Sequence, residues 1–163
     1  MSLWRHLVAV LLCPVAVTVV VPALVVWRTG SGIEALGLLG LPLIALGLLL
    51  VASTIRLFAT IGRGTLAPWD PTTRLVVRGP YRYVRNPMIS GVLFILLGEA
   101  ALFGSLALLF WFGLALAVNA VYMPVFEEPG LERRFGEEYE RYRAHVPRWI
   151  PRVRPWDSQE PGR

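Results

Sequence analysis

Long blocks of apolar residues alternate with short polar stretches along this chain. Residues 7–27 carry no charge, and residues 36–58 carry only Arg56, in the last turn of the block. Two further apolar runs, residues 88–103 and 106–126, are separated only by Gly104 and Ser105. A helix of about 20 residues crosses the roughly 30 Å hydrocarbon core of a bilayer. The pattern predicts an all-α membrane protein with four transmembrane helices, of which the last two form a tight hairpin.

The charged residues predict how these helices are oriented. Residues 62–86 are the first strongly polar region, and they hold five arginines against one acid, Asp70. If four spans leave both chain ends on one side of the membrane, every arginine except Arg28 lies on that side. Because basic residues collect on the cytoplasmic side, we expect a cytoplasmic loop and two cytoplasmic termini. A cleaved signal peptide is a weaker alternative for residues 7–27, since the apolar run exceeds a usual signal core.

The C-terminal part of the chain shows a helical repeat. Leu131, Phe135, Tyr139 and Tyr142 recur at intervals of three or four residues and therefore share one face of a helix. We expect a C-terminal amphipathic helix over residues 130–144, lying on the bilayer or on the bundle, that ends before Pro147. Residues 1–155 then form a single integral-membrane domain, and residues 156–163 are expected to be a loose tail.

Composition supports a membrane protein and argues against other classes. The sequence is 55% hydrophobic with a net charge of +5, and its single cysteine, Cys13, lies inside the first apolar block. In a soluble protein this charge would suggest nucleic acid, but next to apolar spans it fits cytoplasmic loops and anionic lipid. His6 and His145 are isolated in the sequence, so we expect no metal site.

Two polar clusters flank the predicted hairpin. The first is the proline-punctuated basic loop before the third span, and the second is the acidic pair Glu127 and Glu128 after the fourth. Adjacent antiparallel spans joined by a tight turn bring their free ends to a similar depth. We therefore expect the acidic pair to lie beside the arginine- and tyrosine-rich loop.

Both clusters carry recognisable motifs. Residues 79–91 read Gly-Pro-Tyr-Arg-Tyr-Val-Arg-Asn-Pro-Met-Ile-Ser-Gly. The second motif comprises Glu127, Glu128, Leu131, Phe135, Gly136, Tyr139, Tyr142, Val146, Pro147, Arg148 and Pro151. Together they resemble the isoprenylcysteine carboxyl methyltransferase and phospholipid methyltransferase family of integral-membrane enzymes. Asn86 stands where that family has histidine, and Ile89 where it has tyrosine.

The resemblance implies methyl transfer from S-adenosylmethionine to a lipid-like or isoprenoid-like acceptor at the cytoplasmic membrane face. By the same resemblance the cofactor is held by Thr73, Arg74, Leu75, Val76, Tyr81, Asn86, Pro87, Met88, Ile89 and Glu127. Arg85 lies beside these residues and suits the carboxylate of the cofactor. A glutamate suits the ribose hydroxyls and the ammonium group of the cofactor, and aromatic faces suit adenine.

Methyl transfer is an in-line displacement that depends mainly on positioning and on the exclusion of water. An amine acceptor must lose a proton, and Glu128 is the available base. Asn119 either lines an acceptor pocket or forms an interhelical hydrogen bond with Ser90. In the isoprenylcysteine branch an arginine one turn before the acidic pair grips the substrate carboxylate. Met123 occupies that position here, which argues against a prenylcysteine substrate.

Two other functions remain open from the sequence. The chain could be a catalytically inactive membrane protein of the same fold, altered at Asn86 and Ile89. It could also be a membrane reductase that uses a nicotinamide cofactor, although no glycine-rich dinucleotide fingerprint is present. The acceptor group, which could be a carboxyl, an amine or a thiol, is not specified by the sequence.

Overall fold

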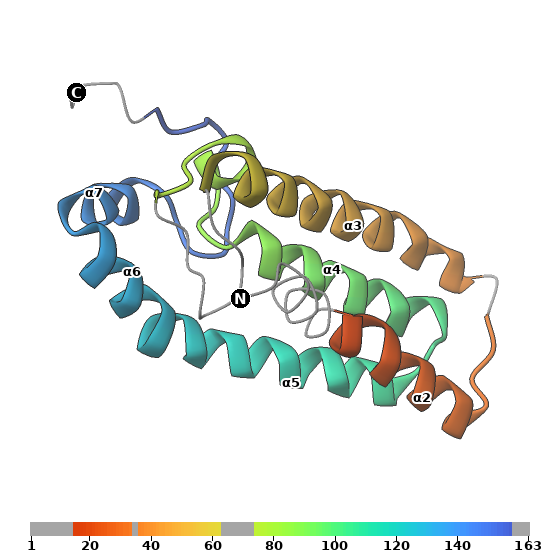
Figure 1. The fold of residues 1–163 in the computed structure, drawn as a ribbon. Helices are drawn as coiled ribbons and strands as arrows, with labels where there is room; N and C mark the ends of the chain where they lie inside the picture. Colours follow the sequence, from red (N-terminus) through yellow and green to blue (C-terminus); the bar gives the residue numbers. More distant parts are fainter. Residues whose placement is uncertain (1–14, 34–35, 63–73, 158–163) are drawn as a thin grey trace.

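The structure, a computed structural model, describes residues 15–33, 36–62 and 74–157 (Figure 1). All regular structure in these ranges is helical. The α-helices are α2 (Val21–Thr29), α3 (Gly40–Leu57), α4 (Pro87–Leu102), α5 (Leu106–Tyr122), α6 (Glu128–Phe135) and α7 (Glu137–His145). The π-helical segments are η1 (Ala16–Val20), η3 (Phe58–Gly62) and η5 (Met123–Glu127), and the 3-10 segments are η2 (Leu36–Leu39) and η4 (Gly79–Arg82).

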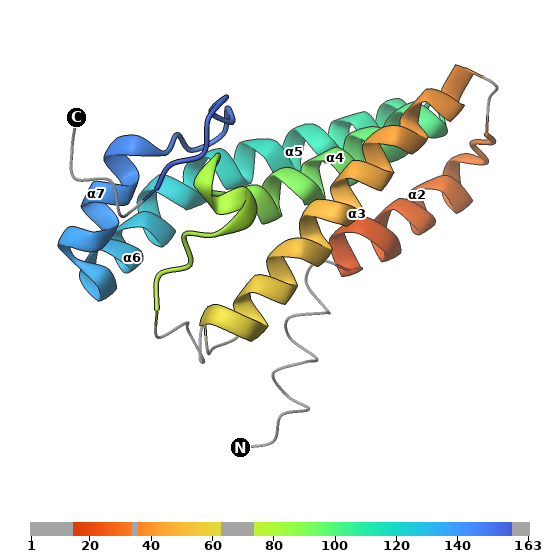
Figure 2. The same cartoon turned by 90° about the horizontal axis from the view of Figure 1, so that it is seen from above.

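Helix α4 lies between α3 and α5 in the centre of the bundle (Figures 1 and 2). Apart from Ser90 and Glu99 its sequence is formed by apolar and small residues, and it buries residues such as Val92, Leu96 and Ala100. A helix that is hydrophobic on nearly all sides is suited to a position among other helices or in lipid. In this structure α3 and α5 cover two sides of α4.

Small residues allow α3 and α4 to pack very closely. A Cβ on Gly47 would lie 2.5 Å from the carbonyl oxygen of Gly91, and one on Gly40 would overlap the carbonyl oxygen of Gly98. Glycines at such positions let two helix backbones approach each other, which is a common mode of helix association in membranes. The α3–α4 pair is therefore a fixed platform for the segments at its ends.

The predicted hairpin between the third and fourth apolar runs is confirmed. Gly104 adopts a left-handed conformation with φ of 54°, and the Ser105 hydroxyl accepts a hydrogen bond from the Leu108 amide at 3.4 Å. This N-cap begins α5 immediately after the turn, so α4 and α5 run antiparallel. The free ends of the two helices consequently lie at the same end of the bundle (Figure 1).

The prediction of four transmembrane helices is not confirmed. Within the described residues, two continuous helices are long and apolar enough to cross a membrane, Gly37–Ile61 and Leu106–Phe135. Helix α4 has 16 residues, a length of about 24 Å, which is shorter than a typical hydrocarbon core. The described part of the first apolar block gives the short helix Ala16–Thr29, and residues 7–14 of that block lie outside the described residues.

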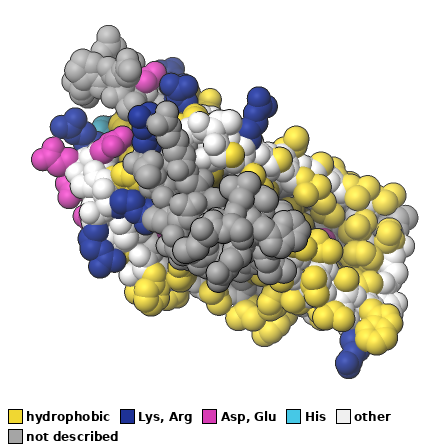
Figure 3. Space-filling view, viewed as in Figure 1, with side chains coloured by type: hydrophobic (Ala, Val, Ile, Leu, Met, Phe, Trp, Pro, Cys, Tyr) yellow, Lys and Arg dark blue, Asp and Glu magenta, His cyan; other side chains and the backbone are white. Residues whose placement is uncertain are grey.

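Polar and apolar surfaces occupy different ends of the molecule. In Figure 3, most basic and acidic side chains gather at the end formed by α6 and α7, while hydrophobic side chains cover the bundle toward the opposite end. Exposed apolar residues on α5 include Phe110, Val118 and Val121. Such a surface is suited to lipid, and the charged end is suited to water or headgroups.

The expected C-terminal amphipathic helix is present as two helices, which corrects the prediction of one helix over residues 130–144. The helix is interrupted between α6 and α7 at Gly136, whose φ of 50° and ψ of −129° are not helical. Glycine adopts such a conformation without a steric penalty, so the break lies where the sequence allows it.

The predicted apolar face of this region is nevertheless maintained across the break. Tyr139, Tyr142 and Val146 form a buried cluster, against which Leu131 and Phe135 pack. Leu75 and Val77 from the loop before α4 pack on the same cluster, together with Trp156. The tyrosine face is therefore covered by protein.

Residues 146–157, which we call the strap, lie along the loop that precedes α4. Three backbone hydrogen bonds join them, from Arg85 N to Pro147 O, from Arg152 N to Tyr83 O and from Trp156 N to Arg82 O, each 2.9 Å long. The strap extends the cap that α6 and α7 form on the bundle.

The first two residues of the expected loose tail, Trp156 and Asp157, also contact the loop. The Arg82 side chain donates to the Trp156 carbonyl oxygen at 2.8 Å and pairs with Asp157 at 3.0 Å. Residues 158–163 lie outside the described residues. The boundary expected after residue 155 stays a prediction.

Candidate functional site

The loop before α4 places the N-terminus of this helix, which has no side-chain cap, at the charged end of the bundle. Gly79, with φ of 57°, and Pro80 begin the short helix η4, and the chain then reaches α4 at Asn86 and Pro87. Asn86 occupies the N-cap position without making a side-chain cap hydrogen bond. The first amide groups of a helix have no intrahelical acceptors, so this N-terminus offers free donors and a positive dipole end.

Two side-chain donors beside this N-terminus are also unused. Asn86 Nδ2 and Arg85 Nε are buried, and neither has a hydrogen-bond partner among the described residues. Buried polar atoms normally have partners, so unpartnered donors in a folded protein need an explanation. A ligand group that accepts hydrogen bonds, such as a carboxylate, is the kind of partner that such donors lack.

Glu128 is the centre of a buried ion cluster. Its carboxylate accepts from Arg148 Nε at 2.6 Å and from Arg148 Nη2 at 2.9 Å, and it lies 3.1 Å from Arg85 Nη1. Arg85 Nη1 also donates to the Tyr139 hydroxyl at 3.3 Å. The side chains of Glu128 and Arg85 are 8% and 9% exposed. The hydrogen bond to the Glu128 carboxylate raises the pKa of Arg148.

This cluster joins three segments that are distant in sequence. Arg85 comes from the loop before α4, Glu128 from the start of α6, and Arg148 from the strap. Charge-assisted bidentate pairs such as Arg148–Glu128 fix both distance and orientation. The predicted meeting of the acidic pair with the basic loop is therefore present in the structure.

The two acids of the pair have different surroundings. Glu128 is buried, whereas Glu127 is exposed. The negative charge of Glu127 acts on Tyr81, whose pKa is raised first by burial and then by Tyr142 and Glu127. Glu127 is therefore the acid of the pair that is free to meet a ligand next to the loop.

The Tyr81 side chain, predicted to bind the cofactor, lies in the interior of the cap. It is 8% exposed, and its ring packs edge-on against Phe58 at a centroid distance of 5.7 Å. Its carbonyl oxygen accepts a 2.7 Å hydrogen bond from the hydroxyl of Tyr142, whose pKa is raised by burial. These contacts fix η4 between the end of α3 and α7.

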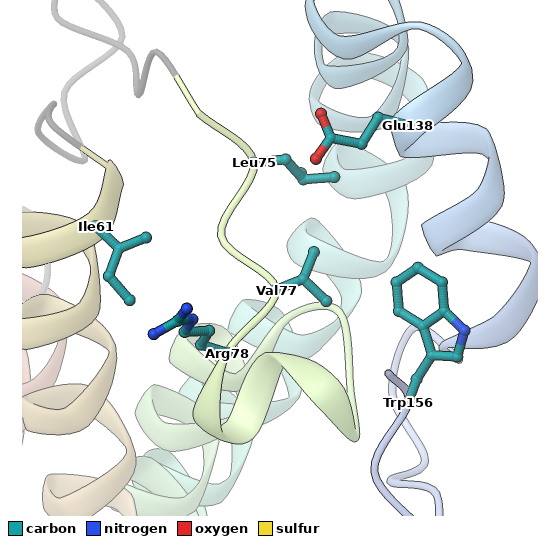
Figure 4. Close-up of a pocket in the computed structure, with 6 residues that line it drawn as sticks. All are labelled: Ile61, Leu75, Val77, Arg78, Glu138 and Trp156. Atoms are coloured by element: carbon teal, nitrogen blue, oxygen red, sulfur yellow. The ribbon is translucent and has the colours of Figure 1, made fainter. Parts of the chain in front are cut away.

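The segment predicted to hold the cofactor through Thr73–Val76 lies at the edge of a cavity. Leu75 lines this cavity, Arg74 is exposed, Val76 is 5% exposed, and Thr73 lies outside the described residues. The cavity has a volume of about 160 Å³. We call it the loop–strap groove, and Figure 4 shows its lining residues, Ile61, Leu75, Val77, Arg78, Glu138 and Trp156.

Asn119 does not make the expected interhelical bond. Its amide donates to the carbonyl oxygen of Ala115 at 2.8 Å, within α5. The Ser90 hydroxyl donates to the carbonyl oxygen of Asn86 at 3.0 Å, within the first turn of α4. Each side chain thus bonds to its own helix, and a role for Asn119 in an acceptor pocket stays a prediction.

Three residues of this region were not among the predicted site residues. Arg148 pairs with Glu128, Tyr139 pairs with Arg85, and Trp156 lines the groove. The strap contains several arginines and a single acid, Asp157, so a search for distant acidic partners could have identified Arg148. Trp156 follows the last proline of the motif and gave no comparable signal.

Comparison with known proteins supports the motif-based interpretation. Residues 36–138 match the family described as phospholipid methyltransferase. This range covers α3, the loop, α4, α5 and the acidic pair, and it ends before the strap. No curated protein and no solved structure matched the chain. With the match extending over more than half of its length, the chain belongs to the phospholipid methyltransferase family.

Proposed function

We propose that the protein transfers a methyl group from S-adenosylmethionine to a membrane lipid, at the cytoplasmic face of the membrane. The family implies a methyltransferase that acts on lipids. Our proposal of S-adenosylmethionine as the methyl donor rests on the junction of the loop before α4 with the acidic pair after α5. Glu128 holds this junction together through its ion pairs.

The donors at this junction fit the amino-acid end of the cofactor. The unpartnered Nδ2 of Asn86 and Nε of Arg85 lie beside the uncapped N-terminus of α4, to which Met88 and Ile89 contribute backbone amides. A helix N-terminus with additional donors is a suitable site for a carboxylate. Glu127 is exposed next to the same loop and suits the ammonium group or the ribose hydroxyls.

When bound, S-adenosylmethionine supplies an electrophilic methyl group on a sulfonium. The residues of this chain then have to orient that group and to keep water away from it. Asn86 keeps a donor at the position where the family pattern has histidine, and an amide does not titrate. We therefore expect Asn86 itself to add no pH dependence to cofactor binding between pH 5 and 8, the range in which a histidine would titrate.

The acceptor is proposed to be a lipid that carries no carboxylate at the reacting end. Met123, which is 7% exposed, occupies the position at which the isoprenylcysteine branch has an arginine that binds the substrate carboxylate. Glu128 as the base for an amine acceptor stays a prediction. Both of its oxygens already accept from guanidinium groups, which favours a role in holding Arg85 and Arg148.

The surface supports a cytoplasmic site with access from the bilayer. The cap carries most of the described arginines, and the adjoining bundle surface is hydrophobic (Figure 3). A lipid headgroup at the boundary between these surfaces would lie close to the junction of α4 and η5. Basic residues on this end agree with the cytoplasmic side.

The experiment that tests the function follows a labelled methyl group from S-adenosylmethionine into a total lipid extract. We expect protein-dependent labelling of a lipid, which is then identified by chromatography and mass spectrometry. Glu137→Ala, which removes an exposed acid from α7, serves as a control and should leave lipid labelling intact. An absence of label in lipid would favour an inactive protein of the same fold, and nicotinamide-dependent reduction of lipid would favour the reductase.

A further inference from the structure

The strap carries two large apolar side chains on its surface. Val153 is 97% exposed and Ile150 is 80% exposed. Between Glu127 and Asp157, a range that the structure describes completely, no other large aliphatic or aromatic side chain is exposed. Isolated apolar residues on a surface are ordinary, but two in one short segment beside an apolar bundle indicate a contact surface.

The hydrogen bonds of the strap place it beside the beginning of α4. They join it to Arg82, Tyr83 and Arg85, which directly precede this helix, and both views of the ribbon show the strap beside the start of α4 (Figures 1 and 2). Tyr83 is 36% exposed, and tyrosine collects at membrane–water interfaces. Because the apolar surface of the bundle ends here, the strap lies at the level expected for lipid headgroups.

The charge of the strap suits an anionic surface. Arg148 is neutralised by Glu128. Arg152 and Arg154, which flank Val153, form no ion pair with any residue that the structure describes. Cytoplasmic leaflets contain anionic lipids, which attract basic residues close to the membrane. An exposed apolar side chain between two arginines is complementary to a phospholipid surface, in which phosphates lie just outside the acyl chains.

The strap presents this surface in a fixed conformation. Pro151 and Pro155 each fix one backbone φ angle, and three backbone hydrogen bonds hold the strap on the loop. At the end of the strap, the Trp156 indole stacks on His145 with a centroid distance of 5.4 Å. A segment that is already ordered loses little conformational freedom when it binds.

We infer that the strap is a membrane anchor that binds anionic phospholipid. Ile150 and Val153 enter the boundary between headgroups and acyl chains, and Arg152 and Arg154 lie among the phosphates. The helices α6 and α7 do not supply this contact through their tyrosine face, because protein covers that face. The anchor goes beyond the proposed function and does not depend on it, since it requires neither a methyl donor nor an acceptor.

Spin labelling of the full-length protein in bilayers tests the anchor. Cys13→Ala removes the only native cysteine, and Val153→Cys carries the nitroxide at a side chain that is 97% exposed, so the fold should be unchanged. In bilayers that contain phosphatidylglycerol, we expect this label to be more accessible to oxygen, which concentrates in lipid, than to a water-soluble nickel chelate. Glu137→Cys, at an 89% exposed side chain on α7, is the control and should show the opposite order.

The role of anionic lipid is tested with the same Val153 label. One arginine near an anionic surface contributes about 1 kcal/mol, so Arg154→Gln should lower the ratio of bound to free strap about fivefold. Replacing phosphatidylglycerol with phosphatidylcholine should lower this ratio at least as much, because it removes the attraction to both arginines of the anchor. Arg141→Gln, at a 76% exposed side chain on α7, should leave the ratio unchanged.

Three results would overturn the anchor. Greater accessibility of the Val153 label to the nickel chelate in phosphatidylglycerol bilayers would show that the strap lies in water. An equal ratio of bound to free strap in both lipids would show that it does not bind anionic lipid. Spin–spin broadening that disappears on dilution with unlabelled protein would identify a second copy of the chain as the occupant of this surface. Each result leaves the proposed function standing, because no methyl donor is present.

Discussion

Replacing Glu128 with alanine is expected to lower the free energy of unfolding by about 3–5 kcal/mol, because the change leaves a buried charge on Arg85 without its carboxylate. The same change releases Arg148 and therefore the strap. We expect denaturant unfolding in detergent to show this loss. Affinity for S-adenosylmethionine should fall as well, since Arg85 and the loop are no longer held against α6.

An exposed ion pair in the same cap provides the matched control. Glu132 and Arg143 lie 3.3 Å apart, but their side chains are 38% and 44% exposed. Exposed pairs contribute about 0–1 kcal/mol, so Glu132→Ala should have a small effect. Equal losses of stability in Glu128→Ala and Glu132→Ala would show that the buried cluster does not hold the cap together.

Replacing Glu127 with alanine is expected to abolish detectable binding of S-adenosylmethionine with little change in stability. The Glu127 side chain is proposed to bind the ammonium or hydroxyl groups of the cofactor. Because it is exposed, it contributes little to the free energy of unfolding. Hydrogen bonds to charged groups contribute about 1.5–3 kcal/mol, and the attraction between opposite charges adds to this. Isothermal titration of purified wild type and variant measures the difference.

Glu127→Gln separates charge from hydrogen bonding at this position. The amide keeps one acceptor and loses the negative charge, so we expect affinity between that of wild type and Glu127→Ala. Wild-type affinity in Glu127→Ala would refute the assignment of this residue to the cofactor site.

Local sequence patterns were sufficient to predict several parts of the structure. The Gly104–Ser105 interruption predicted the hairpin because a positive φ and an N-cap are local properties of these residues. The spacing of Tyr139 and Tyr142 predicted that both lie on one face of a helix, because residues three apart share one side. In the structure both side chains are buried. The hairpin in turn predicted that the acidic pair would meet the loop.

The orientation of the two acids could not be predicted from spacing. The π-helical segment η5, which contains Pro124, separates α5 from α6. A π-turn takes more residues than an α-turn and changes which side of the helix the following residues face. A regular α-helix continued from α5, with about 100° of rotation per residue, therefore does not predict that Glu128 is buried and Glu127 is exposed.

Long-range partners were also beyond the sequence patterns. Arg148 is 20 residues from Glu128, and Arg82 is 74 residues from Trp156. Their pairing depends on how the strap folds back over the loop, which no helical or strand periodicity specifies. The break at Gly136 depends similarly on packing, because glycine permits a non-helical conformation without requiring one.

The loop before α4 and the acidic pair after α5 are proposed to form one binding site for S-adenosylmethionine. Amide hydrogen exchange of the intact protein in detergent, measured with and without saturating S-adenosylmethionine, examines both halves of this site at once. We predict slower exchange in two separate segments, at Met88 and Ile89 and at Phe126–Glu128, with no change in α2. Slower exchange in only one of the two segments, or in neither, would show that they do not form one cofactor site.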